Sequence, residues 1–236
     1  MKIWLNHTLA CPDDGAYPLK LVIFTWENQE EDFSKLVKGY GAKSLFNFRN
    51  EESPLNFEIL DSMPMNALIE KNISQLEEDS GIIHLVKDNE EGVIYDTCVI
   101  DPLPIDRYFQ YYLEFLEEFS AIFDRSEYTS ATESFKLIVE EIQSTIKEAY
   151  VKSKELPFGD LNEFLKPILQ DLLFLNIFLT YMEIEEGVLV CSSCKTWFPV
   201  IKTIPRIYPK TMKREEMDLN FLTKWRKLYP DDVILD

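Results

Sequence analysis

Three of the four cysteines in this 236-residue chain lie near its two ends, and this placement limits how the chain can fold. Cys191 and Cys194 form a Cys-x-x-Cys pair, and Cys11 stands alone near the start. Two intervening residues let both thiolates of such a pair face one metal ion, while backbone amides of the turn donate to the sulfurs. Cys11 follows a strand-like segment and enters a turn, so it is the natural third ligand. Binding of one ion by all three would bring the two ends of the chain together.

A thioredoxin-like redox pair is the alternative interpretation of Cys191 and Cys194. Such a pair normally lies between a strand and a helix. Here the pair falls between two segments that are both typical of strands, so we favour a metal site.

A tetrahedral zinc ion needs a fourth ligand. The spacing indicates Asp14, three residues after Cys11, and Asp13 and His7 are the alternates. The predicted metal ligands are therefore Cys11, Asp14, Cys191 and Cys194. The competing interpretation is a former zinc site in which packing alone maintains the fold.

The pattern of apolar residues predicts an α+β protein with a discontinuous organisation. Residues 1–26 and 184–212 are rich in β-forming side chains and predict one small zinc-ribbon-like β domain. Residues 27–183 predict a large, mainly helical insert domain with a β-hairpin at 82–95. Residues 213–236 predict a C-terminal helix and tail.

The helices of the insert are predicted from the spacing of apolar side chains. These recur at every third or fourth position in residues 106–124, 129–151 and 160–182, and Asp160 is the expected N-cap of the third helix. The second half of that helix is apolar nearly all round, which predicts burial among other helices or against a partner. Cys98 follows the predicted hairpin and is expected to be a small buried side chain.

The chain is strongly acidic, with 42 Asp and Glu against 24 Lys and Arg and a formal charge of −18. Such a surface repels phosphate backbones, so we expect no direct extended nucleic-acid binding by this chain alone. The acidity serves solubility or, alternatively, docking on a basic partner.

The longest apolar stretch, residues 172–182, is far short of the ~20 residues that span a bilayer, so we expect no membrane association. The first residues lack the pattern of a signal peptide. We therefore expect a cytoplasmic protein with reduced cysteines.

Motifs for catalysis and cofactor binding are absent from the sequence. No Gly-x-Gly-x-x-Gly follows a predicted strand, and the single Gly39-Tyr40-Gly41 is expected to be a turn. The two histidines, His7 and His84, have no nucleophile and carboxylate beside them. We therefore expect that the chain is not an enzyme and binds no nucleotide or S-adenosylmethionine itself.

Residues 196–208 combine large apolar side chains at alternating positions with prolines that leave a strand edge unpaired. Such a strand could donate or accept a neighbouring strand from another protein. The alternative is that these side chains fill the core of the ribbon itself. Because a small ribbon can bury only some of them, we expect part of this surface to contact the insert or a partner.

The two chain ends together resemble the family of small zinc-ribbon activator subunits shared by several tRNA, rRNA and release-factor methyltransferases. At the N-terminus the similar segments are Met1-Lys2, Leu9-Ala10-Cys11-Pro12 and Tyr17-Pro18-Leu19-Lys20-Leu21. At the C-terminus they are Glu186-Gly187-Val188-Leu189-Val190-Cys191-Ser192-Ser193-Cys194, Trp197-Phe198-Pro199-Val200 and Ile204-Pro205-Arg206. The family also builds one ribbon from both ends and inserts helices between them.

The resemblance implies a non-catalytic subunit that binds, stabilises and activates an S-adenosylmethionine-dependent methyltransferase as a heterodimer. The enzyme would act on tRNA, rRNA or a translation factor. In the family the ribbon adds a strand to the sheet of the enzyme. Carried over by position, the partner-binding residues are Trp197, Phe198, Pro199, Val200, Ile204, Pro205 and Ile207.

The chain departs from the family pattern at three places. The second N-terminal cysteine of the family is Asp14 here, its usual glycine before Ile-Pro is Thr203, and the middle of the chain is far longer. Two other functions stay open. One is a zinc-ribbon adaptor in another transcription or translation assembly, and the other is an enzyme with an unrecognised site in the helical insert.

Overall fold

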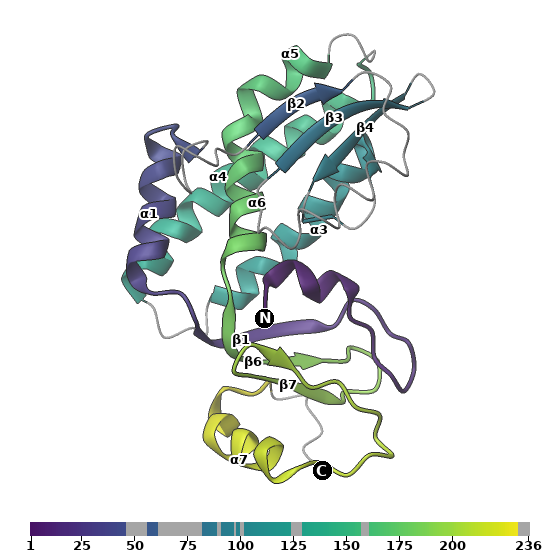
Figure 1. Cartoon of the computed structure of the whole chain (residues 1–236), viewed down its shortest axis with the longest axis vertical. Helices are drawn as coiled ribbons and strands as arrows, with labels where there is room; N and C mark the ends of the chain where they lie inside the picture. Colours follow the sequence, from purple (N-terminus) through teal and green to yellow (C-terminus); the bar gives the residue numbers. More distant parts are fainter. Residues whose placement is uncertain are drawn as a thin grey trace. The chain divides into compact units, whose positions relative to one another are not determined.

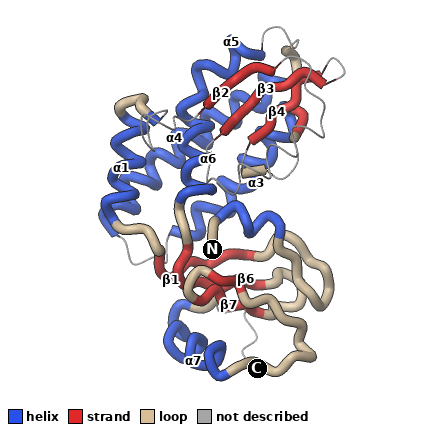
Figure 2. The backbone as a smooth tube through the Cα atoms, in the orientation of Figure 1, coloured by secondary structure: helices blue, strands red, loops and turns tan. Residues whose placement is uncertain are grey.

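A computed structural model shows that the chain forms two compact units, each containing helices and strands (Figures 1 and 2). The residues that it describes are 1–45, 56–60, 82–88, 91–96, 98–99, 102–123, 129–156 and 161–230. The first unit comprises Met1–Gln29, Glu118–Thr129 and Met182–Asp236, and the second comprises Glu30–Glu117 and Ser130–Tyr181. The mixture of helices and sheets confirms the predicted α+β class.

The first unit contains a four-stranded antiparallel sheet with the order β1-β6-β7-β8. The strands are β1 (Lys20–Trp26), β6 (Ile184–Val190), β7 (Trp197–Ile201) and β8 (Ile204–Pro205), and the 3₁₀ helix η1 (Ile3–Thr8) precedes them. β1 pairs with β6, with Lys20 opposite Val190, so both ends of the chain enter one sheet. β1 and β7 are buried along nearly their whole length, which explains their content of apolar and β-branched residues.

Helix α7 (Glu216–Trp225) and the 3₁₀ turn η5 (Arg226–Leu228) cover one face of this sheet (Figure 1). Phe221 and Trp225 point from the helix onto the sheet, and the ring of Trp225 stacks on Phe24 with centroids 5.0 Å apart. The shared core contains Val22, Phe24, Val188, Val190, Trp197, Ile201, Phe221, Trp225 and Tyr229. The C-terminal helix expected within residues 213–236 is therefore part of the first unit, and residues 231–236 lie outside the described chain.

Polar contacts fix both ends of α7. Asp218 is fully buried, and its carboxylate accepts a hydrogen bond from Arg206 Nε at 2.7 Å. At the other end, Trp225 Nε1 donates to the Glu186 carboxylate at 2.7 Å. A buried charge is stable only when it is paired and hydrogen-bonded, so the Arg206–Asp218 contact sets the position at which the helix begins.

The second unit contains a separate sheet with the order β2-β3-β4-β5. Its strands are β2 (Asn56–Leu60), β3 (Ile82–Asp88), β4 (Glu91–Asp96) and β5 (Leu103–Pro104). β3 and β4 pair antiparallel across the residues where we expected a hairpin. β2 lies parallel to β3, a pairing that the sequence analysis did not anticipate.

The second unit also contains five helices among its described residues. They are α1 (Glu30–Gly41), α3 (Ile105–Phe123), α4 (Thr129–Ser153), α5 (Leu161–Leu165) and α6 (Leu169–Tyr181), with the 3₁₀ turn η4 (Lys166–Ile168) between the last two. Helix α3 continues past Glu117 and α4 begins at Thr129, so both enter the segment Glu118–Thr129 of the first unit. The helix predicted for residues 160–182 is present from Leu161 to Tyr181, with one 3₁₀ turn within it at Pro167, which lacks the N–H that would continue the α-helical ladder. Its expected cap, Asp160, lies outside the described residues. Gly39 and Gly41 end α1 instead of forming a separate turn.

Helix α6 forms the centre of the second unit. Phe135 of α4 contacts Phe174 and Phe178 of α6, with ring centroids 5.0 and 4.7 Å apart. Nearly every residue of α6 is buried, as its all-round apolar pattern predicts. By length and composition alone residues Glu163–Tyr181 could cross a membrane, but 67% of the stretch is buried within the structure, and core helices pass the same test.

A fully buried carboxylate, Asp96 at the end of β4, links three elements of the second unit. Tyr108 and Tyr112 of α3 donate to Oδ2 at 2.6 and 2.7 Å. Asn176 of α6 and the backbone N–H of Cys98 donate to Oδ1. Cys98 is buried, as predicted, but it also hydrogen-bonds to Asp96 and Tyr112 through its sulfur.

The packing of α7 makes a prediction about stability. We expect Phe221→Ala to lower the free energy of unfolding by about 3–5 kcal/mol, because it leaves a cavity beneath the helix. Leu219→Ala, on the exposed side of the same helix, should change it by less than about 0.5 kcal/mol. Urea unfolding of both variants measures the difference, and equal effects would show that α7 does not pack on the sheet.

Candidate metal centre and sheet edge

The two cysteine-bearing turns of the first unit have the same backbone conformation. In the first turn, Cys11 N–H donates to Ala16 O at 3.0 Å and Gly15 N–H donates to Cys11 O at 2.9 Å. In the second, Cys191 N–H donates to Thr196 O at 2.9 Å and Lys195 N–H donates to Cys191 O at 3.1 Å. We call these turns knuckle 1 (residues 11–16) and knuckle 2 (residues 191–196).

A left-handed residue occupies the same place in each knuckle, with φ of +72° at Gly15 and +60° at Lys195. Glycine adopts this conformation without strain, whereas Lys195 adopts it at some cost. The residue just before it is Asp14 in knuckle 1 and Cys194 in knuckle 2. The backbone alone therefore assigns Asp14 to the position that a second thiolate occupies in the other turn.

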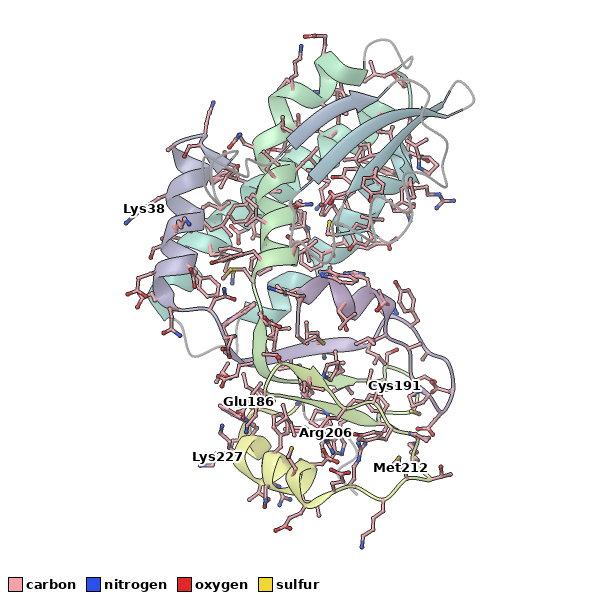
Figure 3. All side chains as sticks on the ribbon, viewed as in Figure 1. Lys38, Glu186, Cys191, Arg206, Met212 and Lys227 are labelled. Atoms are coloured by element: carbon pink, nitrogen blue, oxygen red, sulfur yellow. The ribbon has the colours of Figure 1, made fainter. Side chains whose placement is uncertain are left out.

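The knuckles place four ligand atoms together. The Sγ atoms of Cys11, Cys191 and Cys194 and a carboxylate oxygen of Asp14 all lie within 4.8 Å of one another. Figure 3 shows Cys191 at the end of β6 opposite to Glu186, where the strand enters its knuckle. The structure thus brings together the four residues that the sequence analysis selected.

The separations fit a tetrahedral ion. Cys11 Sγ lies 3.6 Å from Cys194 Sγ, and Cys191 Sγ lies 3.5 Å from both oxygens of Asp14. Two thiolates bound at about 2.3 Å to one tetrahedral ion lie about 3.8 Å apart, and a thiolate and a carboxylate oxygen about 3.5 Å apart. The backbone N–H of Cys194 donates to Cys191 Sγ at 3.3 Å, an amide contact of the kind that supports metal-bound sulfur. The group could therefore hold a metal ion.

The alternates for the fourth ligand lie outside this group. Asp13 turns away and accepts a hydrogen bond from the backbone N–H of Lys210 at 2.9 Å. His7 is not among the residues whose ligand atoms converge. Lys210 was missed by sequence reasoning, although it contacts both knuckles through Asp13 and through the carbonyl of Cys194. Only its place in a Pro-Lys-Thr turn could have indicated this role.

The protonation chemistry of the group is set by burial and local hydrogen bonds. Burial raises the pKa of the Cys11 thiol to about 12. The backbone N–H of Ala16, followed by the neighbouring thiols, holds the pKa of the Asp14 carboxyl well below its usual range. A divalent cation would displace the thiol protons, since metal-bound cysteines are thiolates. The Cys191–Cys194 pair leads from β6 into β7, without the helix that follows a thioredoxin-like redox pair.

Strand β8 forms one edge of the sheet in the first unit. A two-residue turn connects it to β7, with φ of +50° at Lys202 and +67° at Thr203. Two left-handed central residues are characteristic of a type I′ hairpin turn, which matches the twist of paired strands. The N–H of Arg206 donates to Pro199 O at 2.8 Å and extends the pairing past β8.

The structure separates the predicted partner-binding residues into two groups. Trp197, Phe198, Pro199 and Val200 are buried within β7, so their side chains are already in contact with the protein itself. Ile204 is 62% exposed, and Pro205 and Ile207 are half-buried. Only these last three offer side-chain surface at the edge. Arg214 covers Trp197, with its guanidinium carbon 4.4 Å from the ring centroid.

These features define a class of protein. Its β domain is built from both chain ends and carries two knuckles that can share one ion, and an α+β unit is inserted in the sequence between those ends. The sequence model of the Trm112p-like protein family matches residues 5–202. The chain therefore belongs to the Trm112p-like family, which is in general a family of non-catalytic adaptors that activate methyltransferases. No curated protein matches the chain, and neither does any solved structure.

The shared geometry of the knuckles predicts the effect of restoring a fourth thiolate. We expect Asp14→Cys to raise the affinity for zinc by at least about tenfold, because thiolate is the stronger ligand for a structural site. Competition with a chromophoric chelator measures the affinity, and cobalt(II) absorption reports tetrahedral sulfur ligation. Asp13→Cys is the matched control and should leave both readouts unchanged. A gain of the same size in the control would contradict the assignment of Asp14.

The hairpin turn predicts a stabilising substitution. Thr203→Gly should raise the free energy of unfolding by about 1 kcal/mol, because a β-branched residue is strained at positive φ. The same change at Thr25, in the extended strand β1, should instead lower it by about 1 kcal/mol. Denaturant unfolding compares the two, and destabilisation by both would exclude the turn conformation described here.

Proposed function

We propose that this chain is a non-catalytic subunit that binds, stabilises and activates an S-adenosylmethionine-dependent methyltransferase acting on tRNA, rRNA or a translation factor. The observation that carries the proposal is membership of the Trm112p-like family across residues 5–202. The sheet built from both chain ends supports it, because its last strand has an edge without a neighbouring strand among the described residues. The partner holds S-adenosylmethionine and performs the chemistry.

The edge of β8 is the proposed contact with the enzyme. Since Arg206 N–H bonds inward to Pro199, the alternating pattern of a strand directs the carbonyl of Pro205 away from β7. Proline has no N–H to leave unsatisfied there, which suits an edge position. A strand of the enzyme would pair beside β8, with the exposed Ile204 as an apolar anchor.

Zinc is the ion that we propose for the metal centre. Three thiolates and one carboxylate make a closed set of four protein ligands, the arrangement of structural zinc sites. Such a site leaves no coordination position for a substrate. Its role here is to hold knuckle 1 and knuckle 2 together, and so to fix the sheet that presents β8.

The proposal includes that this chain has no catalytic role. It also includes a cytoplasmic location, where cysteines are kept reduced and can bind metal. A zinc-ribbon adaptor in another transcription or translation assembly is the second candidate. It would use the same metal centre and the same strand edge. The identity of the bound protein distinguishes the two functions.

Affinity purification of the tagged chain from its native organism, followed by mass spectrometry, tests the proposal. We expect a near-stoichiometric methyltransferase, which should be lost on Ile204→Asp because a carboxylate would be buried in the proposed interface. Leu137→Asp is the matched control, since Leu137 is 68% exposed on α4 of the second unit. This control should retain the enzyme.

Three outcomes would reject parts of the proposal. Recovery of the chain without a methyltransferase would overturn the function, and recovery of a transcription or translation complex in its place would favour the adaptor. Loss of the enzyme in both variants, or in neither, would show that the edge of β8 is not the contact with the enzyme.

A further inference from the structure

The charge of the chain is divided unequally along its length. The second unit contains 27 Asp and Glu against 12 Lys and Arg, a net charge of −15. Residues 195–227 of the first unit contain nine Lys and Arg against three Asp and Glu, a net charge of +6 within a chain of −18. The acidity that argues against nucleic-acid binding therefore belongs mainly to the other unit.

Most of the acidic groups in this basic segment are already engaged. Asp218 is fully buried and pairs with Arg206, and Glu215 also pairs with Arg206. Among the three acids of residues 195–227, only Glu216 has no ion pair within the described residues. The acids therefore neutralise one arginine and leave most of the lysines available.

Five cations of the segment have exposed side chains: Lys202, Lys210, Lys213, Arg226 and Lys227. We call them the C-terminal basic surface. None of the five has an ion pair with a carboxylate of the described chain. By contrast, Lys224 pairs with Glu186, and Arg214 is stacked on Trp197. Lys210 Nζ donates a long hydrogen bond of 3.4 Å to the carbonyl of Cys194, which leaves its charge unneutralised. The charges of all five can therefore meet an external anion.

Backbone hydrogen bonds and packing position the segments that carry four of these five cations. Lys210 is fixed by its backbone bond to Asp13 of knuckle 1, and Lys213 follows three residues later. Arg226 and Lys227 come directly after α7, whose position is set by Phe221 and Trp225. Figure 1 shows α7 and the chain leading to it on one side of the sheet. Figure 3 places Lys227 beside α7 and Met212 well away from it, in the loop before the helix, so the cations are spread along this side of the unit.

We propose that the C-terminal basic surface binds the phosphate backbone of RNA. Lysines that stand free on a surface bind phosphates as point charges and carry no base specificity. The match to the family model ends at residue 202. Lys202 is therefore its last matched residue, and the other four cations lie beyond it. The contact would therefore be a property added to the ribbon by its C-terminal segment.

The other anionic partners fit this surface less well. A helix that lies on a membrane needs a free apolar face, whereas Phe221 and Trp225 of α7 are already buried on the sheet. A protein interface is depleted in lysine and centres on aromatic or apolar anchors. This surface is lysine-rich, and its nearby exposed apolar side chains, Met212, Met217 and Leu219, belong to different faces of the loop and helix.

The choice of RNA over DNA rests on the proposed function, in which the partner enzyme acts on RNA or on a translation factor. The binding itself does not need that enzyme. It can be measured with the full chain alone, so that a failure of this inference is distinguishable from a failure to recover a methyltransferase.

Fluorescence anisotropy with a labelled single-stranded RNA of about 20 nucleotides tests the inference, over about 50 to 200 mM salt. The variant K210E/K213E/K227E should bind at least about tenfold more weakly at the lowest salt. The slope of log affinity against log salt should become shallower by about 2, as expected for three lost phosphate contacts on a single strand. The matched control is K136E/K147E/K152E, which makes the same change of charge on exposed lysines of α4.

The control should bind RNA within about twofold of the unaltered chain. No binding by the unaltered chain, or equal losses in the two triple variants, would overturn the inference. Stronger binding to vesicles of phosphatidylcholine and phosphatidylserine than to RNA would also overturn it. Thermal unfolding checks that each variant is folded, and the single variants K213E and K227E replace the triple variant if it is not.

Discussion

Pairing of β1 with β6 is the constraint on which the rest of the first unit depends. These strands come from opposite ends of the chain, and the cysteines beyond them, Cys11 and Cys194, are 183 residues apart in sequence. Closing so long a loop costs conformational entropy, and the cost rises only slowly with length. An ion shared by the two knuckles would crosslink the two chain ends. Because it binds only when β1 and β6 are paired, its binding free energy would offset the entropy lost in closing the loop. The insert can therefore be large without weakening the sheet in proportion.

The aromatic residues of β7 are buried within the first unit. Trp197 and Phe198 belong to the core of the first unit, and α7 supplies the side chains that cover one face of the sheet. In the interface that we propose, a partner would meet the backbone of β8, the exposed Ile204 and the half-buried Pro205 and Ile207 instead of a broad aromatic surface. Such an interface derives its specificity from strand register and from the shape of the edge.

The sequence was a good guide where local chemistry decides the structure. The Cys-x-x-Cys spacing and the Cys-Pro-Asp-Asp-Gly turn sufficed to select Asp14 as the residue beside the three sulfurs, and apolar periodicity located α3, α4 and α6. It was a poor guide where tertiary contacts decide. The local sequence gives no indication that β2 pairs parallel to β3. The Lys202-Thr203 dipeptide also does not predict a type I′ turn, which is normally built from Asn and Gly.

Burial of the predicted edge residues could not be inferred for a similar reason. The alternating pattern of residues 196–208 is equally compatible with a core strand and with a docking strand. The deciding factor is α7, which begins eight residues after this segment. The buried Asp96 is a further example. A lone aspartate in a strand gives no sign that two tyrosines and an asparagine will surround it.

The distribution of the cysteines gives each unit its own chemical reporter. Cys98 is enclosed in the second unit, where burial and the neighbouring Asp96 carboxylate raise the pKa of its thiol well above the usual value, so an alkylating reagent reaches it only when that unit opens. The three remaining thiols lie together in the two knuckles of the first unit. Counting modified thiols against time in one sample would therefore separate the opening of the inserted unit from the release of the paired chain ends.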